Sequence, residues 1–360
     1  MTIKKTPAFI AAAVALVALP LLAQQLGNGP VRIMDLALLY VMLALGLNIV
    51  VGYAGLLDLG YVAFYAVGSY MFALLASPHL AENFAWMHSV FPNGLHMPIW
   101  LVIPLGAGLA AFFGVLLGAP TLKLRGDYLA IVTLGFGEII RVFLNNMEQP
   151  LNITNGPRGI GQIDSLQVLG INLGRPLDVL GFRVSSVTLY YYLFLALVVL
   201  FVVICHRLEK SRIGRAWMAI REDEIAAKAM GINTRNLKLL AFGMGATFGG
   251  VAGVLFASFQ GFVSPESYSL QESVMIVAMV VLGGLGHLPG VILGALMLAA
   301  LPEVLRYVAG DIQSMTGGRI DASILRQLLI ALAMIIIMLV RPRGLWPSPE
   351  HGKAAPAAVK

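Results

Sequence analysis

Four charged side chains stand out because they fall inside long apolar runs of this 360-residue sequence. A charge in hydrocarbon is costly unless it is paired or hydrated, so such residues mark ion pathways, proton relays or internal ion pairs. Glu138 and Arg141 are spaced i,i+3, and we expect them to pair with each other. Asp58 and Glu272 lie near the ends of their runs, where we expect water to solvate them. The four residues do not form the ladder of acids and histidines that a proton-coupled carrier uses.

Motifs for catalysis are absent from the sequence. It contains no G-x-x-x-x-G-K-[ST] phosphate-binding loop, no H-E-x-x-H zinc motif and no G-x-S-x-G nucleophile motif. His79, His88 and His96 do not have the spacing of metal ligands on a helix, and we interpret them as surface histidines. We therefore expect a chain that is not an enzyme, with no catalytic residue, metal site or cofactor. An ATP-driven step would take place, with its Mg²⁺, on a partner ATPase.

The composition indicates an all-α polytopic membrane protein. Hydrophobic residues make up 59% of the chain and charged residues 12%, and several apolar runs exceed the roughly 18 residues needed to cross a bilayer. We expect a single transmembrane domain over 1–345 and a short, disordered cytoplasmic tail at 346–360. The domain is expected to have about ten spans, at 8–23, 31–51, 56–76, 98–118, 127–145, 188–205, 237–260, 271–286, 289–309 and 322–340.

The distribution of basic residues predicts the orientation of these spans. With the N-terminus in the cytoplasm, 16 of the 24 Lys and Arg residues fall on the inner side, as the positive-inside rule requires. Both termini and the loop at 206–236 are then cytoplasmic, and the longer external loop covers 146–187. The first helix follows Lys4 and Lys5, and we expect it to be retained. The net charge of +6 thus reflects orientation in a bacterial inner membrane rather than nucleic-acid binding.

The cytoplasmic loop is the most polar internal segment of the chain. Eight of the 24 basic residues lie between His206 and Lys238. Ile213, Trp217 and Ile220 recur at i, i+4 and i+7, so we expect a short amphipathic helix there. A loop of this kind, held at the membrane by helices on both sides, is suited to contact a soluble partner.

A second short helix is predicted directly after the first. Asp223 is its expected N-cap, and Glu224 in the first turn suits the positive end of the helix dipole. Gly231 is the expected C′ residue that ends this helix. Either Asn233 or Thr234 is expected to cap the long helix that follows.

Residues 225–231 read I-A-A-K-A-M-G, which resembles the E-A-A-x-x-x-G signature in the cytoplasmic loop of ABC importer permeases. Ile225 stands in place of the glutamate, and Glu224 comes one position earlier. The loop is most similar to that of the branched-chain amino acid (LIV-type) permease family. Two other stretches resemble the same family: N-x-x-x-G-Y-A-G-L-x-x-L-G at 48–60 and G-D-Y-L-A-I-V-T-L-G at 126–135. The resemblance covers nearly the whole chain.

The resemblance implies a role for the loop and a set of partners. In the family this loop docks into a cleft of an ATPase subunit, and the residues expected to couple to the ATPase here are Arg215, Trp217, Glu224, Ala226, Ala227 and Gly231. The expected assembly has a second, related permease subunit, which makes a heterodimer. It also has two P-loop ATPase subunits that bind ATP and Mg²⁺, and a periplasmic binding protein that meets the external loops.

Two apolar stretches, one in each half of the chain, are interrupted by glycine. Residues 46–60 and 283–290 occupy comparable places in the two halves, and paired interruptions of this kind indicate a translocation pathway. Tight re-entrant turns at the membrane surface are the alternative. The predicted pathway residues are Asn48, Gly52, Gly55, Asp58, Gly283 and Gly286. Glycines repeated at intervals of four are predicted to pack helices closely, and they are Gly245, Gly249 and Gly253.

These observations predict a permease subunit of an ATP-driven importer for leucine, isoleucine and valine, which forms half of the translocation pathway. Urea or a short amide is the alternative substrate, because the same family carries these. Two alternatives come from other classes. An ion-coupled secondary transporter would need no ATPase, and a membrane scaffold would have no pathway.

Overall fold

The computed structural model describes residues 6–25, 27–91, 94–121, 124, 126–168, 170–179, 182–315, 322–341 and 344–346. Lys4, Lys5 and the predicted tail after Trp346 lie outside these residues. Each predicted span overlaps one long helix. These helices are α1 (Thr6–Gln25), α2 (Asn28–Leu47), α3 (Val62–Leu75), α6 (Ile99–Thr121), α7 (Asp127–Asn146), α8 (Ser186–Glu209), α11 (Thr234–Gln260), α12 (Leu270–Gly283), α13 (Leu288–Met315) and α14 (Ala322–Val340).

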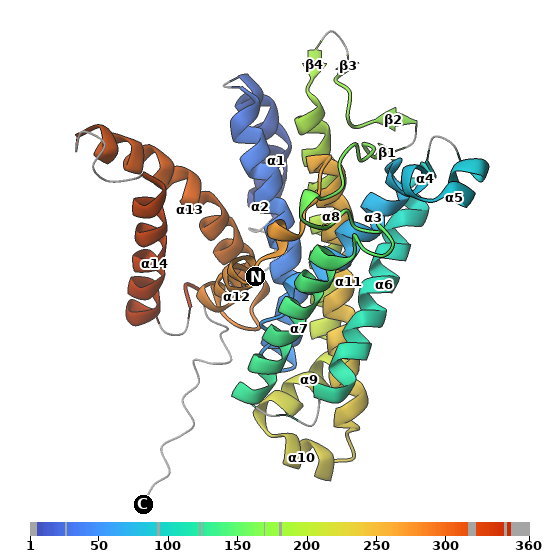
Figure 1. The fold of residues 1–360 in the computed structure, drawn as a ribbon. Helices are drawn as coiled ribbons and strands as arrows, with labels where there is room; N and C mark the ends of the chain where they lie inside the picture. The colour runs from blue at the N-terminus through green and yellow to red at the C-terminus, as the bar shows by residue number, and fades with distance from the viewer. Residues whose placement is uncertain are drawn as a thin grey trace, which may run out of the picture.

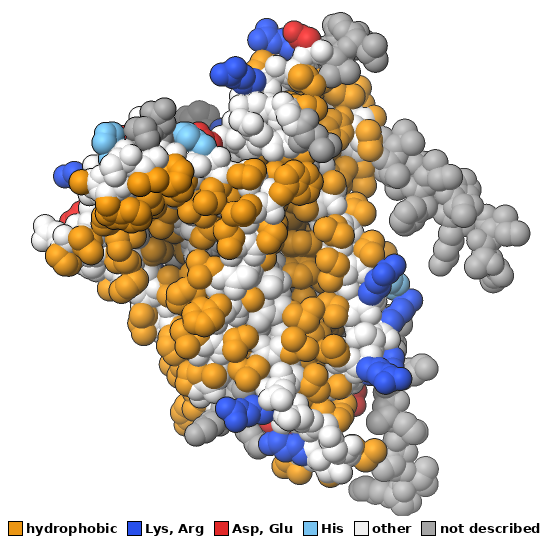
Figure 2. Space-filling view, turned by 90° about the vertical axis from the view of Figure 1, so that its right-hand side faces the viewer, with side chains coloured by type: hydrophobic (Ala, Val, Ile, Leu, Met, Phe, Trp, Pro, Cys, Tyr) orange, Lys and Arg blue, Asp and Glu red, His pale blue; other side chains and the backbone are white. Residues whose placement is uncertain are grey.

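The surface of the helix bundle is suited to lipid. Phe112, Ile131 and Ile139 are each more than 60% exposed. Figure 2 shows hydrophobic side chains over the middle of one face, with Lys and Arg toward its ends. An apolar band between polar ends is the surface expected of a membrane protein. The described stretches that are long and apolar enough to cross a membrane are Asn28–Tyr53, Ile99–Thr121, Ser186–Glu209, Thr234–Gln260 and Leu288–Arg306.

Helix α11 lies inside the bundle, against α2, α3 and α6 (Figure 1). Its glycines let the backbones of neighbouring helices come close. A Cβ atom on Gly253 would lie 2.2 Å from the carbonyl oxygen of Tyr65 in α3. Close backbone packing matters in lipid, because the hydrophobic effect does not drive helices together there. Similar close approaches to neighbouring elements occur at Gly245, Gly249 and Gly250.

Polar segments lie at the two opposite ends of the bundle (Figure 1). The short helices α4 (His79–Asn83) and α5 (Ala85–Val90) lie at one end, together with the long loop that follows α7. The helices α9 (Arg212–Glu222) and α10 (Glu224–Ala229) lie at the other end. Residues 206–209 belong to α8, so the polar loop is shorter than predicted at its start.

The loop after α7 contains four short strands, which the prediction of an all-α chain did not include. Without a long helix, its backbone groups pair partly across two small antiparallel sheets. The strands β1 (Gln167–Val168) and β2 (Ile171–Asn172) form one sheet, and β3 (Leu177–Val179) and β4 (Phe182–Val184) form the other. The 3-10 turn η2 (Gly156–Arg158) precedes them, and a second turn, η3 (Pro265–Tyr268), follows α11.

Both predicted helix interruptions are present as breaks. At Asn48, α2 passes into a π-helical turn, η1 (Asn48–Tyr53), and the chain is non-helical until α3 begins. The prediction of a helix over 56–76 is therefore wrong for its first six residues. Tertiary packing explains this, because Gly60 approaches α7 so closely that a Cβ would lie 2.0 Å from the Thr133 carbonyl oxygen. The second break separates the end of α12 from the start of α13.

Candidate functional site

The two helix breaks meet each other directly. The backbone N–H of Gly286, in the second break, donates a hydrogen bond of 2.9 Å to Asn48 Oδ1 in the first. Asn48 is completely buried. Gly52 lies beside this bond, and a Cβ atom there would be 2.0 Å from Asn48 Oδ1 and 2.7 Å from the Gly286 nitrogen. The two interruptions, one from each half of the chain, therefore form one junction.

Arg221, in the last turn of α9, reaches into this junction. Its guanidinium donates a hydrogen bond to the carbonyl oxygen of Gly52. That carbonyl lies in the final turn of the helical stretch from Asn28 to Tyr53, where carbonyl groups lack helical partners and the helix dipole favours a cation. Partial burial lowers the pKa of Arg221, and the neighbouring Glu222 opposes this effect.

Two glycines make room for the Arg221 side chain. Gly55 has φ of +68°, and a Cβ there would lie 2.7 Å from Arg221 Cγ. Gly286 has φ of +78°, and a Cβ there would lie 3.0 Å from the guanidinium nitrogen Nη1. Glycine tolerates these left-handed conformations without steric cost. The arginine thus lies against both breaks at once.

The end of α12 is capped by a segment near the C-terminus of the chain. The backbone nitrogen of Leu345 donates to the Leu282 carbonyl at 2.7 Å, and that of Trp346 donates to the Gly283 carbonyl at 3.2 Å. His287 Nδ1 lies 2.9 Å from the Trp346 carbonyl oxygen. These bonds satisfy carbonyl groups that the helix end would leave unpaired.

Local sequence signals set the two short helices between α8 and α11, as predicted. Asp223 is the N-cap of α10, and its Oδ1 accepts from the backbone nitrogens of Ile225 (2.7 Å) and Ala226 (3.1 Å). Asn233, one of the two expected caps, caps α11 by accepting from Asn236. Gly231 has the left-handed φ of +81° expected of a C′ residue. We call α9 and α10 together the α9–α10 hairpin.

The α9–α10 hairpin is anchored to α11 at two points. The indole Nε1–H of Trp217, in α9, donates to the Leu237 carbonyl at 2.7 Å. Glu224, in α10, pairs with Lys238 at 2.8 Å and with Lys228 at 3.4 Å. Partial burial opposes ionisation of Glu224, but the two lysines outweigh it and lower its pKa. The hairpin is therefore held against the central helix of the bundle.

The six residues predicted to couple to an ATPase differ in exposure, and Glu224 is half-buried. Arg215, Ala226 and Gly231 are exposed. Trp217 and Ala227 are buried within the chain, so their side chains position the hairpin rather than present a surface. Sequence reasoning missed Arg221, although its place at the end of a short cationic helix was visible. Beyond these predicted residues, Ile225 in α10 is 68% exposed and Met230, directly after α10, is 81% exposed.

The remaining pathway and membrane residues are more buried than predicted. Asp58 is 1% exposed, and its Oδ1 accepts from the Gly60 nitrogen, so the expectation that water solvates it is wrong. Gly283 packs against Gly290 of α13. Glu272 accepts a hydrogen bond of 2.9 Å from Tyr40. Asn48, Gly52, Gly55 and Gly286 thus come together with Arg221, whereas Asp58 and Gly283 make other contacts.

Two further acids of the long helices, Glu138 in α7 and Asp35 in α2, differ in whether they have a partner. The predicted pair of Glu138 and Arg141 forms, at 2.9 Å, and Arg141 also binds Glu266 of η3 at 2.7 Å. Sequence reasoning overlooked Asp35 in α2. It is completely buried, and neither carboxylate oxygen has a hydrogen-bond partner among the described residues. The signal was an acid followed by a long apolar run in α2.

Comparison of the sequence with known proteins identifies the family of this chain. Residues 29–339 match the family model of the branched-chain amino acid transport system / permease component. The chain is 41% identical to the high-affinity branched-chain amino acid transport system permease protein LivM of Escherichia coli (strain K12), over 96% of this chain and 76% of that protein. It is 25% identical to the corresponding permease protein LivH of the same organism, over 92% of this chain and 97% of that protein. No solved structure matches.

The chain belongs to this permease family. The family predicted from residues 225–231, 48–60 and 126–135 is thereby confirmed. A third relative is the probable branched-chain amino acid transport permease protein LivM of Methanocaldococcus jannaschii. It is 28% identical, over 86% of this chain and 90% of that protein. Relatives named as branched-chain amino acid permeases do not favour the alternatives of an ion-coupled carrier or of a urea importer.

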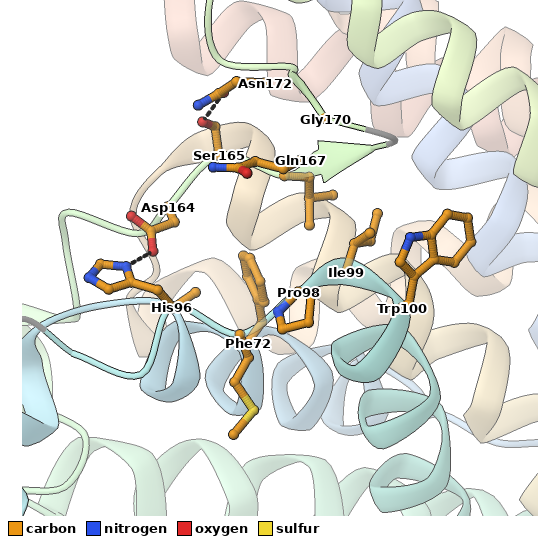
Figure 3. A pocket seen from close by; sticks show the side chains of 13 residues that line it. Phe72, His96, Pro98, Ile99, Trp100, Asp164, Ser165, Gln167, Gly170 and Asn172 are labelled. Atoms are coloured by element: carbon orange, nitrogen blue, oxygen red, sulfur yellow. Dashed lines mark hydrogen bonds and ion pairs between the residues drawn. The ribbon is translucent and has the colours of Figure 1, made fainter. Parts of the chain in front are cut away.

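At the end opposite α9 and α10, this permease has a cavity of about 420 Å³ (Figure 3). One side is apolar and includes Trp100 at the start of α6, and the other is the polar segment that leads into β1 and β2. His96 pairs with Asp164, and Ser165 donates to Asn172 at 2.6 Å (Figure 3). The His96–Asp164 pair joins the two loops that were predicted to be external.

The histidines at this end differ in environment. His88 and His96 are exposed, as predicted, but His79 is only 9% exposed, which corrects its interpretation as a surface histidine. Its ring packs beside Asn83, and burial lowers the pKa of His79. No cluster of metal-ligating side chains occurs within the described part of the chain.

Proposed function

We propose that this chain is a transmembrane permease subunit of an ATP-driven importer for branched-chain amino acids. Family membership and the names of the bacterial relatives support this substrate class. We infer that the chain crosses a bacterial inner membrane about ten times, with both termini in the cytoplasm. It supplies half of the translocation pathway.

The observation that carries the ATPase-coupling role is the outward face of α10. Ile225 and Met230 are exposed apolar side chains at the extreme end of the molecule, next to the small residues Ala226 and Ala229. The cap at Asp223 fixes the start of the helix. An apolar helix face that points away from the bundle is suited to dock in a groove of a soluble partner. We propose that this partner is one of two P-loop ATPase subunits, which bind ATP and Mg²⁺.

We propose a second permease subunit as the other membrane partner. The chain is similar both to a relative named LivM and to a relative named LivH, which are two different permease proteins of one organism. A heterodimer of such subunits would enclose the pathway between them. On the outer side, a periplasmic binding protein would meet the cavity beside Trp100 and the loop that carries β1 to β4.

Purification of the tagged chain in mild detergent tests the docking proposal. The chain is expressed together with its proposed partners, which are the ATPases, the second permease and the binding protein. We expect the ATPases to co-purify with wild type. The variant Ile225→Asp/Met230→Asp should lose at least about 90% of them, because charges would replace a central apolar contact. The matched control is Asn236→Asp, which adds a charge at an exposed position nearby. ATPase retention by the double variant would disprove docking on α10.

A further inference from the structure

We propose that Arg221 is the positioning residue that links the α9–α10 hairpin to the junction of the two helix breaks, and that its withdrawal opens the cytoplasmic end of the pathway. This inference rests on the proposed function. It adds a specific latch, made by one arginine of α9 on two glycine-rich breaks that belong to different halves of the chain.

The first argument is the reach of the side chain. Arg221 begins on the hairpin that would receive the ATPase, and its guanidinium ends at the Gly52 carbonyl and beside Gly286. A displacement of α9 therefore changes the contacts of both breaks in one step. The neighbouring residues Glu222 and Asp223 are exposed and lead directly into α10. Only these two residues separate Arg221 from α10, so a movement of α10 should also move Arg221.

The second argument is the tightness of the contact. The site of a Cβ on Gly55 lies 2.7 Å from Arg221 Cγ, 3.1 Å from its Cβ and 3.3 Å from its Cα. The arginine therefore packs on Gly55 along its stem, while its charged end contacts Gly52 and lies beside Gly286. Packed contacts of this kind switch between discrete arrangements instead of deforming gradually. A shift of α9 should release the stem and the guanidinium together.

The third argument is what would hold the junction after release. Asn48 would still accept from the Gly286 nitrogen, but the Gly52 carbonyl would lose its charged donor. That carbonyl would then take its hydrogen bond from water, which can enter beside Gly55, an exposed residue, into the space that the arginine leaves. Withdrawal of the arginine and hydration of the junction are thus coupled. We infer that the hydrated junction is the open cytoplasmic end of the pathway.

The test uses the complete importer in proteoliposomes, with ATP hydrolysis and leucine uptake measured in parallel. We expect Arg221→Ala to hydrolyse ATP within about 2-fold of wild type while leucine moved per ATP falls about 10-fold, as loss of one charged hydrogen bond allows. Arg221→Lys should be intermediate, because an ammonium can reach Gly52 but lacks the planar fork. Arg212→Ala removes the same charge from the same helix and is the matched control, with normal coupling expected.

A second variant covers the case in which Arg221→Ala fails to assemble. Gly55→Ala keeps the arginine but adds a methyl group against its Cγ, and we expect the same loss of leucine moved per ATP. Hydrogen exchange provides a readout independent of transport. In Arg221→Ala, or in Gly55→Ala if only that variant assembles, residues 48–60 and 284–290 should exchange faster while 224–231 do not change.

The outcomes separate the two proposals. Suppose that wild type couples ATP hydrolysis to leucine uptake and that the assembled variants move as much leucine per ATP as wild type. The proposed role of Arg221 is then wrong, and the importer function stands. Equal losses of assembly, hydrolysis and uptake in both variants would mean a purely structural arginine and would also overturn the latch. If wild type shows no ATP-dependent uptake at all, the proposed function itself fails, and the latch fails with it.

Discussion

The backbone N–H of Gly286 donates to the side-chain amide oxygen of Asn48, a residue 238 positions earlier in the chain. The bond joins the break after α2 to the break after α12, at a depth where Asn48 has no exposed surface. The second break depends on the first, because without Asn48 the Gly286 nitrogen would lose its acceptor. The bond makes the two halves of the permease interdependent.

Replacing Asn48 by alanine should therefore destabilise the permease. The variant leaves the Gly286 nitrogen without its acceptor, which costs about 1–3 kcal/mol for a buried group. Cys205 is the single cysteine and is fully buried, so its labelling by a thiol-reactive dye reports thermal unfolding in detergent. We expect a lower unfolding temperature than wild type, with Asn236→Ala as an exposed control. An unchanged unfolding temperature would mean that the bond contributes nothing.

Two glycine substitutions should change the free energy of unfolding in opposite directions. Gly52→Ala places a Cβ 2.0 Å from Asn48 Oδ1 and should cost about 1–3 kcal/mol through overpacking. Gly135→Ala, in α7, meets no atom within 4 Å and should stabilise by about 0.5–1 kcal/mol, because alanine favours a helix interior. The same thiol-dye assay measures both. Equal shifts for the two variants would contradict the close contact at Gly52.

Much of the local structure was predictable from sequence, whereas the tertiary contacts were not. The caps at Asp223 and Asn233 depend on a few neighbouring residues and were predicted correctly. The non-helical stretch 56–61 was not, because its shape is imposed by the close approach of Gly60 to α7. Glycine-rich interruptions were recognisable in each half, but a single sequence gives no sign that Arg221 would lie between them.

The anchor at Trp217 should be more important for stability than for contact with a partner. Trp217→Phe keeps most of the packing but loses the part-buried hydrogen bond to the Leu237 carbonyl, which should cost about 0.5–1.5 kcal/mol. Trp217→Ala should cost about 3–5 kcal/mol. Thermal unfolding by the thiol-dye assay checks this order. If both variants are as stable as wild type but lose the ATPase, Trp217 would have to act directly on the partner.

The stabilisation by the Glu224–Lys238 ion pair should decrease as the pH falls. The folded pKa of Glu224 lies below its ordinary value of 4.5. Its ionised form therefore stabilises the hairpin above about pH 4.5, and this contribution is lost as the pH falls through the lower folded value. Glu224→Gln should be less stable than wild type at pH 7, and the difference should shrink on acidification. Thermal unfolding followed by tryptophan fluorescence tests this, and a difference independent of pH would contradict the ion pair.

The most direct test of the importer function is uptake of labelled leucine by proteoliposomes that contain the full assembly. ATP is enclosed with the ATPase side, and the substrate-loaded binding protein is added to the other side. We predict uptake that requires enclosed ATP, stops when ATP is replaced by a non-hydrolysable analogue, and needs no ion gradient. Uptake that follows a proton or sodium gradient without ATP would contradict the assignment and indicate a secondary transporter.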